Sequence, residues 1–208
     1  RRGQRRRHVQ MGYMLRHTPG LRLVREAVAA GWLGEINGYD AGMGKRADAS
    51  LRRTLRAHPG HGMMELGCHL VDLTVTLLGV PSAVRAEAER TESDGLPDRQ
   101  RAALRYAWGE ASLSCDHADD TARRWLTIAG TQGTIRVPSL EGNVVHLELA
   151  TAAGPYPRGA TVLRPAAEGR YAGEFRELAG LIEGAATRWD AAHDIAVHAV
   201  ARRAAGLA

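Results

Sequence analysis

The first sixty residues change their hydrophobic period twice. Apolar and polar positions alternate over residues 8–15, which predicts a short strand. Thr18 and Pro19 suit an N-cap and a first helical position, and apolar residues then recur every three or four positions, so a helix should follow to about residue 31. A second strand is predicted over 35–43. The polar, arginine-rich stretch 47–61 indicates a loop or a short helix.

Residues 63–78 have the clearest helical pattern in the chain, and Gly79 closes it. The apolar positions that carry this pattern are Met63, Leu66, Leu70, Leu73 and Leu77. Because side chains four residues apart share a helix face, Glu65 and His69 should lie one turn apart on the same side, and Asp72 should follow them.

Short strands with turn residues between them occupy the middle of the chain, and two helices end it. The predicted strands are 82–89, 101–108, 111–117, 125–129, 134–137 and 143–149, with hairpin turns at 109–110 and 131–133. The Pro- and Gly-rich stretch 151–169 is interpreted as a surface loop, and helices are expected over 171–182 and about 190–205. This order predicts an α+β fold with an open, mostly antiparallel sheet and helices on one face. The other face should be solvated or paired with a second subunit.

Composition is typical of a globular protein of one large domain, which we place over residues 1–208. The 208 residues are 44% hydrophobic and 25% charged, and no apolar run is long enough for a membrane span. The arginine-rich start lacks the apolar segment of a signal peptide. Cys68 and Cys115 are interpreted as free thiols in a reducing compartment, so a cytoplasmic location is expected.

The net charge of +5 comes mainly from the first seven residues, of which five are arginine. Without this basic leading segment the chain is close to neutral, so the excess charge belongs to a terminus and not to a groove. Nucleic-acid binding through this segment is one hypothesis. It is disfavoured because aromatic residues, which would stack on bases, make up only 5% of the chain.

The pair Glu65 and His69 is the main candidate for chemistry. A histidine titrates near neutral pH and suits proton transfer, and a carboxylate one turn away can hold its tautomer. The alternative is an ordinary helix-surface pair worth about 0.2–0.5 kcal/mol. His61 extends the spacing to i, i+4, i+8, as in some metal sites. Gly62 weakens that turn and no second ligand cluster follows, so no metal site is predicted.

Four further positions could border this candidate site. Arg16 and Tyr13 end the first predicted strand, where the arginine could bind a carboxylate or a sugar hydroxyl, or form a surface ion pair. His61 precedes the helix and could line a pocket or belong to a loop. His117, which follows a predicted strand, is interpreted as part of a solvated turn.

Several stretches in the same order resemble the C-terminal domain of the Gfo/Idh/MocA family of NAD(P)-dependent oxidoreductases. "VQMGYMLRHTPGLRLVREAVAAGWLGEI" is similar to the family's opening segment, with its strand-end arginine, Pro-initiated helix and Gly-x-x-Gly-Glu turn. "GMMELGCHLVDLTVTLLG" resembles its Asp-x-Gly-x-His-x-x-Asp helix, with Glu65 in place of the first Asp. "RYAWGEASLSC", "RRWLTIAGTQGTIRV" and "EFRELAGLIEG" are similar to its sheet hairpins and C-terminal helices.

The resemblance implies the substrate-binding half of an oxidoreductase that uses NAD or NADP and acts on a sugar, cyclitol or related polyol or its keto form. It implies His69 as acid/base or ligand of a substrate hydroxyl, with Glu65 beside it. Tyr13, Arg16, His61 and Asp72 would be substrate contacts. Homo-oligomers would form through the sheet face.

The family's dinucleotide-binding domain has no counterpart in this sequence. No GxGxxG occurs, "GTQGT" lies between strands and not before a helix, and Lys45 is not in the family's Glu-Lys-Pro setting. We therefore expect that the nucleotide-binding domain is missing, that this chain alone is catalytically incomplete and that it binds no dinucleotide by itself. A non-enzymatic, self-associating module that keeps the oxidoreductase domain is the alternative.

Overall fold

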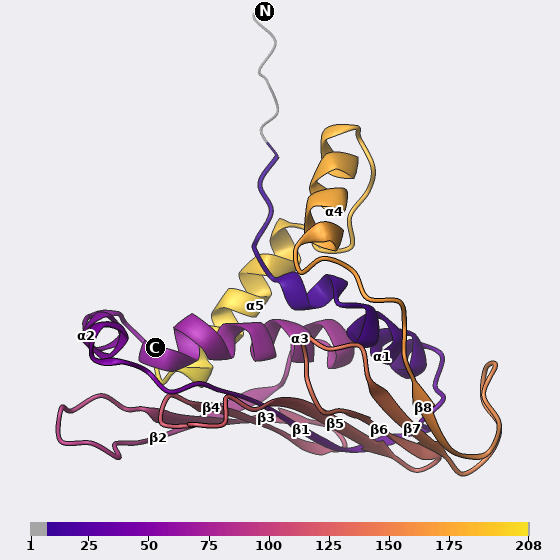
Figure 1. The fold of residues 1–208 in the computed structure, drawn as a ribbon, viewed down its shortest axis with the longest axis horizontal. Coiled ribbons are helices and arrows are strands. Elements are labelled where there is room, and N and C mark those ends of the chain that lie inside the picture. The colour runs from indigo at the N-terminus through magenta and orange to yellow at the C-terminus, as the bar shows by residue number, and fades with distance from the viewer. Residues whose placement is uncertain (1–7, 208) are drawn as a thin grey trace, which may run out of the picture.

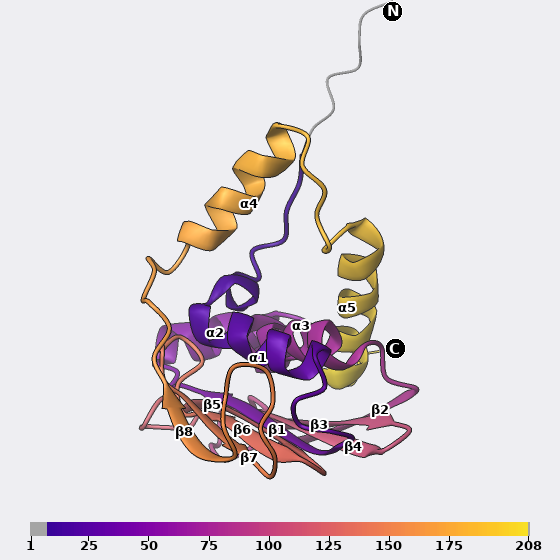
Figure 2. The same cartoon turned by 90° about the vertical axis from the view of Figure 1, so that its right-hand side faces the viewer.

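A single eight-stranded sheet with helices on one side forms the body of the protein. The computed structural model describes residues 8–207, and in it the strands follow the order β2-β3-β4-β1-β5-β6-β7-β8 while the helices lie on one side of the sheet (Figures 1 and 2). The strands are β1 (Ile36–Gly44), β2 (Ala83–Glu89), β3 (Arg99–Tyr106), β4 (Gly109–Asp116), β5 (Arg124–Gly130), β6 (Gly133–Val137), β7 (Val145–Leu149) and β8 (Gly159–Leu163). The helices are the 3₁₀ turn η1 (Met14–His17), α1 (Pro19–Ala29), α2 (Ala49–Ala57), the π turn η2 (Met63–Gly67), α3 (Cys68–Leu78), α4 (Ala172–Ile182) and α5 (Ala191–Ala204). Within these described residues, no helix combines the length and apolar character that a membrane crossing requires.

The pairing of the strands confirms the predicted open, mostly antiparallel α+β fold. All neighbours run antiparallel except β1 and β4, which are parallel with Tyr39 opposite Ala111. The chain leaves β1 through α2 and α3 before it reaches the β2–β3–β4 meander, and this long crossover permits the parallel pair. The sheet therefore carries β1 at its centre, with a partner on each edge.

The core lies between the sheet and the helices. Side chains of successive strand residues point to opposite faces, and the buried set includes Leu104, Leu113, Ile128 and Ile135, all 0% exposed. They belong to one cluster with Leu70 of α3. Each such side chain contributes about 1.5–3 kcal/mol by leaving water. The alternate strand positions face away from the helices and leave the second face of the sheet open.

Two predictions for the backbone are wrong. No strand forms over 8–15: the chain is irregular to Tyr13 and then enters η1. The segment pairs with neither outer strand of the sheet, β2 or β8, and Tyr13, Met14 and Leu15 are instead buried in the core cluster. The stretch 151–169 is not all loop, because it contains the edge strand β8, which pairs with β7.

The remaining predicted elements are found close to their expected positions. The stretch 47–61 contains the short helix α2, and the final helix begins after Asp190, whose carboxylate accepts a hydrogen bond from the His193 backbone N–H at 2.9 Å. The β3–β4 turn lies at 107–108, two residues before the predicted turn. Both cysteines are free thiols. The basic segment 1–7 lies outside the described residues.

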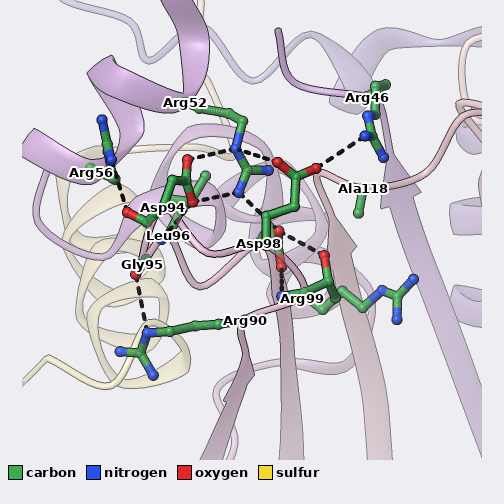
Figure 3. Close-up of polar contacts among 12 residues, drawn as sticks. Arg46, Arg52, Arg56, Arg90, Asp94, Gly95, Leu96, Asp98, Arg99 and Ala118 are labelled. Carbon is green, nitrogen blue, oxygen red and sulfur yellow. Dashed lines mark hydrogen bonds and ion pairs between the residues drawn. The ribbon is translucent and has the colours of Figure 1, made fainter. Parts of the chain in front are cut away.

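A network of charged side chains ties α2 to the loop between β2 and β3 (Figure 3). The buried Arg52 guanidinium donates to the carboxylate of Asp94 at 2.7 Å through both Nε and Nη2, and to Asp98 at 3.1 Å. Asp98 also accepts from the backbone and hydroxyl of Thr91. The loop that precedes β3 is therefore fixed by these polar contacts together with Leu96, which is fully buried in an apolar cluster with Ala47 and Leu55.

Candidate active site

A small cavity between the helix layer and the end of β1 brings together side chains from six parts of the chain. Its volume is about 150 Å³. It is lined by Met14, Leu15, Met43, Lys45, Glu65, Leu66, His69, Arg124, Glu141 and Arg170. Six of these ten residues are ionisable, which is unusual for a space enclosed by core elements. Binding pockets typically measure about 300–1,000 Å³, so this cavity suits only a small ligand or part of a larger one.

The helix that carries Glu65 and His69 begins with a π turn. Met63–Gly67 forms this wide turn and α3 continues from Cys68. Glu65 lies in this turn and His69 in the first turn of α3, and both residues line the cavity.

The Glu65 carboxylate binds two other side chains. Lys45 Nζ donates to Oε1 at 2.7 Å, and Oε2 lies 3.1 Å from His117 Nε2. These contacts hold the pKa of Glu65 at about 2, well below its ordinary value of 4.5, with the His117 hydrogen bond as the larger cause. Glu65 is thus a carboxylate at any physiological pH, and its role in this geometry is to hold Lys45.

His117 is not part of a solvated turn. Its side chain is 1% exposed, and it packs so closely on Gly62 that a Cβ at that position would lie 2.4 Å from Nδ1. It follows β4 directly, where the strand's alternation carries it under the π turn. His117 and Glu65 belong to separate predicted elements, and no pattern in either segment indicates that they meet.

His69 lies at the cavity with its ring against Tyr13. The two ring centroids are 5.8 Å apart in an edge-to-face arrangement. Burial lowers the pKa of His69 below 6.5, and its Nδ1 is buried without a hydrogen-bond partner. Burial also raises the pKa of the Tyr13 phenol. The imidazole is therefore neutral at physiological pH and able to accept a proton.

Arg16 and Asp72 lie behind the cavity and bind each other. Arg16 Nη2 donates to Asp72 Oδ1 at 2.7 Å and to Asp194 Oδ1 at 2.6 Å, and both Arg16 and Asp72 have side chains that are 1% exposed. His61 is also set apart from the cavity-lining residues, because its Nδ1 bonds to the Leu55 carbonyl oxygen at 2.9 Å. None of the three lines the cavity at His69, whereas Arg16 lines the larger cavity beside α4 and α5, and their role as substrate contacts stays a prediction.

Lys45, Arg124, Glu141 and Arg170 line the cavity and were not predicted from the sequence. Lys45 follows β1, Arg124 begins β5, and the other two lie in loops, so only the fold unites them. Lys45 offered one signal, since it is the only lysine in the chain. Within residues 8–207, no three or more His, Cys, Asp or Glu side chains gather in a way that could hold a metal ion.

The fold and this cavity define an α+β open-sheet domain with a charged site between its two layers. The GFO/IDH/MocA C-terminal domain model matches residues 21–136, more than half of the sequence, and the chain belongs to this family. A comparison with curated protein sequences gives no significant match.

Solved structures share the fold at low sequence identity. UDP-N-acetylglucosamine 3-dehydrogenase GnnA from Acidithiobacillus ferrooxidans matches with a TM-score of 0.76 and 20% identity, over 95% of this chain and 60% of that one. Levoglucosan dehydrogenase in complex with NADH and levoglucosan matches with a TM-score of 0.69 and 17% identity, over 92% and 63%. An oxidoreductase from Agrobacterium radiobacter in complex with NAD⁺, L-tartaric acid and magnesium matches with a TM-score of 0.73 and 18% identity, over 94% and 62%. The chain thus spans a little under two thirds of the length of these proteins.

Proposed function

We propose that this chain is the substrate-binding domain of an NAD(P)-dependent oxidoreductase that acts on a sugar, cyclitol or related polyol, or on its keto form. The observation that carries the proposal is His69, a neutral and half-buried imidazole in a charged cavity of a Gfo/Idh/MocA domain. The similarity in fold to a levoglucosan dehydrogenase and a UDP-N-acetylglucosamine 3-dehydrogenase supports the substrate class.

In this proposal His69 moves one proton. When a secondary alcohol is oxidised, its carbon loses a hydride and its oxygen loses a proton, and a neutral imidazole at the hydroxyl accepts that proton. In the reverse direction the imidazolium returns it to the keto oxygen. The Tyr13 ring fixes the position of the imidazole. Lys45, held by Glu65, would orient a neighbouring hydroxyl of the same substrate.

The dinucleotide itself does not fit the described residues. A dinucleotide site needs a glycine-rich turn between a strand and a helix, where backbone N–H groups face the pyrophosphate. The glycine-rich turn of this chain, 130–134, joins the antiparallel strands β5 and β6. NAD or NADP supplies the hydride chemistry in this family by resemblance, and we infer that a second domain binds it.

The surface around α4 suits such a second domain. α4 projects away from the sheet beside residues 8–13, and of its residues only Gly173 is buried (Figure 1). Phe175 is 67% exposed, Ile195 of α5 is 69% exposed and Val9 is 85% exposed. A cavity of about 610 Å³ lies among these elements. Exposed apolar surface of this kind typically marks a contact with another protein unit.

Self-association through the open sheet face is a second candidate role. It is compatible with substrate binding, and a non-enzymatic module would also have it. A shallow cavity of about 450 Å³ lies on that face over β5–β8, between Trp125 and Val162, which is 52% exposed.

The free thiols Cys68 and Cys115 favour a reducing compartment, and we infer a cytoplasmic location.

The test begins with the reading frame upstream of Arg1, which should encode a GxGxxG turn and a Glu-Lys-Pro segment. The complete product should then reduce NAD⁺ or NADP⁺ with a member of a sugar and cyclitol panel. His69→Asn should lower kcat by about 10²–10⁴-fold, the usual contribution of a positioned acid/base. His58→Asn, at an exposed histidine outside the cavity, is the control. Full activity of His69→Asn, or no dinucleotide-dependent turnover by the complete product, would contradict the proposal.

A further inference from the structure

Around the cavity at His69, the cationic side chains outnumber the carboxylates. Three cations, Lys45, Arg124 and Arg170, line it together with two carboxylates, Glu65 and Glu141. Glu65 is occupied by Lys45. Glu141 Oε1 receives both guanidinium groups, Arg124 through Nη1 in a short contact and Arg170 through Nη2 at 3.3 Å. One carboxylate compensates one elementary charge, so the Arg124–Glu141–Arg170 wall keeps a charge of +1.

The two guanidinium groups also keep hydrogen-bond donors in reserve. Each arginine has five N–H donors. The bonds found use only Nη1 of Arg124, and Nη2 and Nε of Arg170, the last toward Met14 Sδ at 3.2 Å. The Arg124 side chain is 23% exposed and that of Arg170 52% exposed, so both groups are accessible to a ligand. A neutral imidazole at His69 adds no charge to compensate the wall.

We propose, on the basis of the function proposed above, that the sugar substrate carries an oxyanion, a carboxylate or a phosphate, which Arg124 and Arg170 bind while a hydroxyl of the same molecule lies at His69. The planar guanidinium fork matches both anions and binds either one through two parallel N–H donors. The oxyanion would neutralise the +1 charge of the wall. A neutral sugar would leave this charge uncompensated once a second domain covers the cavity, and an uncompensated buried charge is costly.

The experiment compares matched neutral and anionic sugars on the 208-residue chain. Isothermal titration calorimetry at low ionic strength would measure the dissociation constants of glucose, gluconate and glucose 6-phosphate, and of the corresponding galactose series. We expect at least one anionic member to bind about tenfold or more tightly than its neutral parent, as charge-assisted hydrogen bonds allow. A preference for gluconate or for the 6-phosphate identifies the anion. The NMR signal of the His69 ring should shift on binding, which places the ligand at the cavity.

Substitutions separate a local anion site from general surface charge. Arg170→Gln and Arg124→Gln should each abolish most of the anionic preference while glucose binding changes little. Arg176→Gln is the matched control, because Arg176 is 64% exposed, pairs with Glu168 and does not line the cavity. Circular dichroism would establish that each variant is folded.

The outcomes are distinguishable. Equal affinity for neutral and anionic sugars, with the His69 signal shifted by both, overturns this inference and leaves the proposed function in place. An equal loss of preference in Arg176→Gln and Arg170→Gln also overturns it, because the effect would then be long-range. Failure of every sugar to bind or to shift the His69 signal counts against the proposed function itself, and against this inference with it.

Discussion

The hydrogen bonds of Glu65 go to partners that its place in the sequence does not indicate. Its spacing pairs it with His69, and both residues line the cavity. The carboxylate bonds to Lys45 and to His117, which come from the ends of two adjacent parallel strands. The buried histidine behind Glu65 thus fixes the carboxylate, and the carboxylate fixes the lysine.

Replacement of this carboxylate should change the acid limb of the stability profile. The pKa of Glu65 is lowered to about 2, mainly by His117 and then by Lys45, so the folded protein favours the ionised form. This stabilisation is complete above pH 4.5, the ordinary pKa of the group, and is lost as the pH falls through about 2. Glu65→Gln should therefore be less stable than the parent near neutral pH, and the difference should shrink between these two pH values.

Urea denaturation at several pH values measures this difference in the free energy of unfolding. The Glu65 side chain is 36% exposed, so we expect a difference of at most about 1 kcal/mol at neutral pH. Glu35→Gln, at an exposed position, should show no such pH dependence. A difference for Glu65→Gln that stayed constant down to pH 2 would mean that the contacts with His117 and Lys45 do not favour the ionised form.

At the scale of elements, a buried ion-pair cluster joins three helices. Arg16 lies in η1, Asp72 in α3 and Asp194 in α5, and the Arg16 guanidinium donates to both carboxylates. His193 Nε2 lies 3.5 Å from Asp72 Oδ1 on the same side. This cluster sets the position of η1, and with it the position of the Tyr13 ring that packs on His69.

Asp72→Asn should therefore destabilise the whole domain. The substitution leaves the buried Arg16 with Asp194 as its remaining charged partner, and removal of one member of a buried pair costs about 3–5 kcal/mol. Because Asp194 persists, we expect the lower end of that range, seen as a lower midpoint in urea unfolding. Asp120→Asn, whose side chain is 79% exposed, should change stability by less than about 0.5 kcal/mol. An unchanged midpoint for Asp72→Asn, with weakened sugar binding, would instead support a direct substrate role.

The sequence predicts elements well where the pattern and the partner are close together in the chain. The hairpins β3–β4 and β5–β6 and the helix α3 have strong local periods, and all are present. The segment 8–15 has an alternating pattern, but Tyr13, Met14 and Leu15 pack in the core cluster and not in the sheet, so its prediction as a strand is wrong. The edge strand β8 lies in a stretch whose proline and glycine residues indicate a loop, and it pairs on one side only.

The candidate site was only partly predictable for a similar reason. His69 and Glu65 were found because they share one segment with a helical pattern. The other charged residues of the cavity come from four separate places in the chain, namely Lys45, Arg124, Glu141 and Arg170. Their proximity depends on the pairing of β1 with β4 on one side and with β5 on the other. No pattern in the sequence indicated the π turn over Met63–Gly67, in which Glu65 lies. A single sequence indicates local geometry, and the site is a product of non-local pairing.

At the scale of the whole molecule, the two sides of the sheet differ in character. One side is covered by helices, and the other is open from β2 to β8 (Figure 2). Trp125 on the open side packs tightly over Gly42, where a Cβ would lie 2.1 Å from the indole, and its Nε1 donates to Asp40. The open side thus carries an ordered indole beside a cavity that is lined by Thr127, Arg136 and Glu148, and we propose contact with a second copy there.

Thr127→Arg tests this contact. Thr127 lies on β5 at the centre of the open face and lines its cavity, so two copies paired there would bring introduced positive charges into a buried interface. We expect the parent chain to form oligomers in size-exclusion chromatography with light scattering, and Thr127→Arg to shift toward the monomer. Thr151→Arg, at an exposed position beyond the end of β7, should keep the parent's mass. A monomeric parent, or an unchanged mass for Thr127→Arg, would contradict self-association through this face.

The exposure of the projecting helix α4 should depend on whether the proposed second domain packs against it. Hydrogen exchange is fast where a helix has few tertiary contacts, and α4 buries only Gly173, against the His17 side chain of η1. In the 208-residue chain its amides should exchange much faster than those of α3. If the proposed nucleotide-binding domain packs on Phe175 and Ile182 in the complete gene product, it should slow exchange in α4 selectively, while α3 changes little because it is already covered on the sheet side. Equal exchange of α4 in both proteins would place the second domain elsewhere, and the apolar surface around α4 would then need another partner.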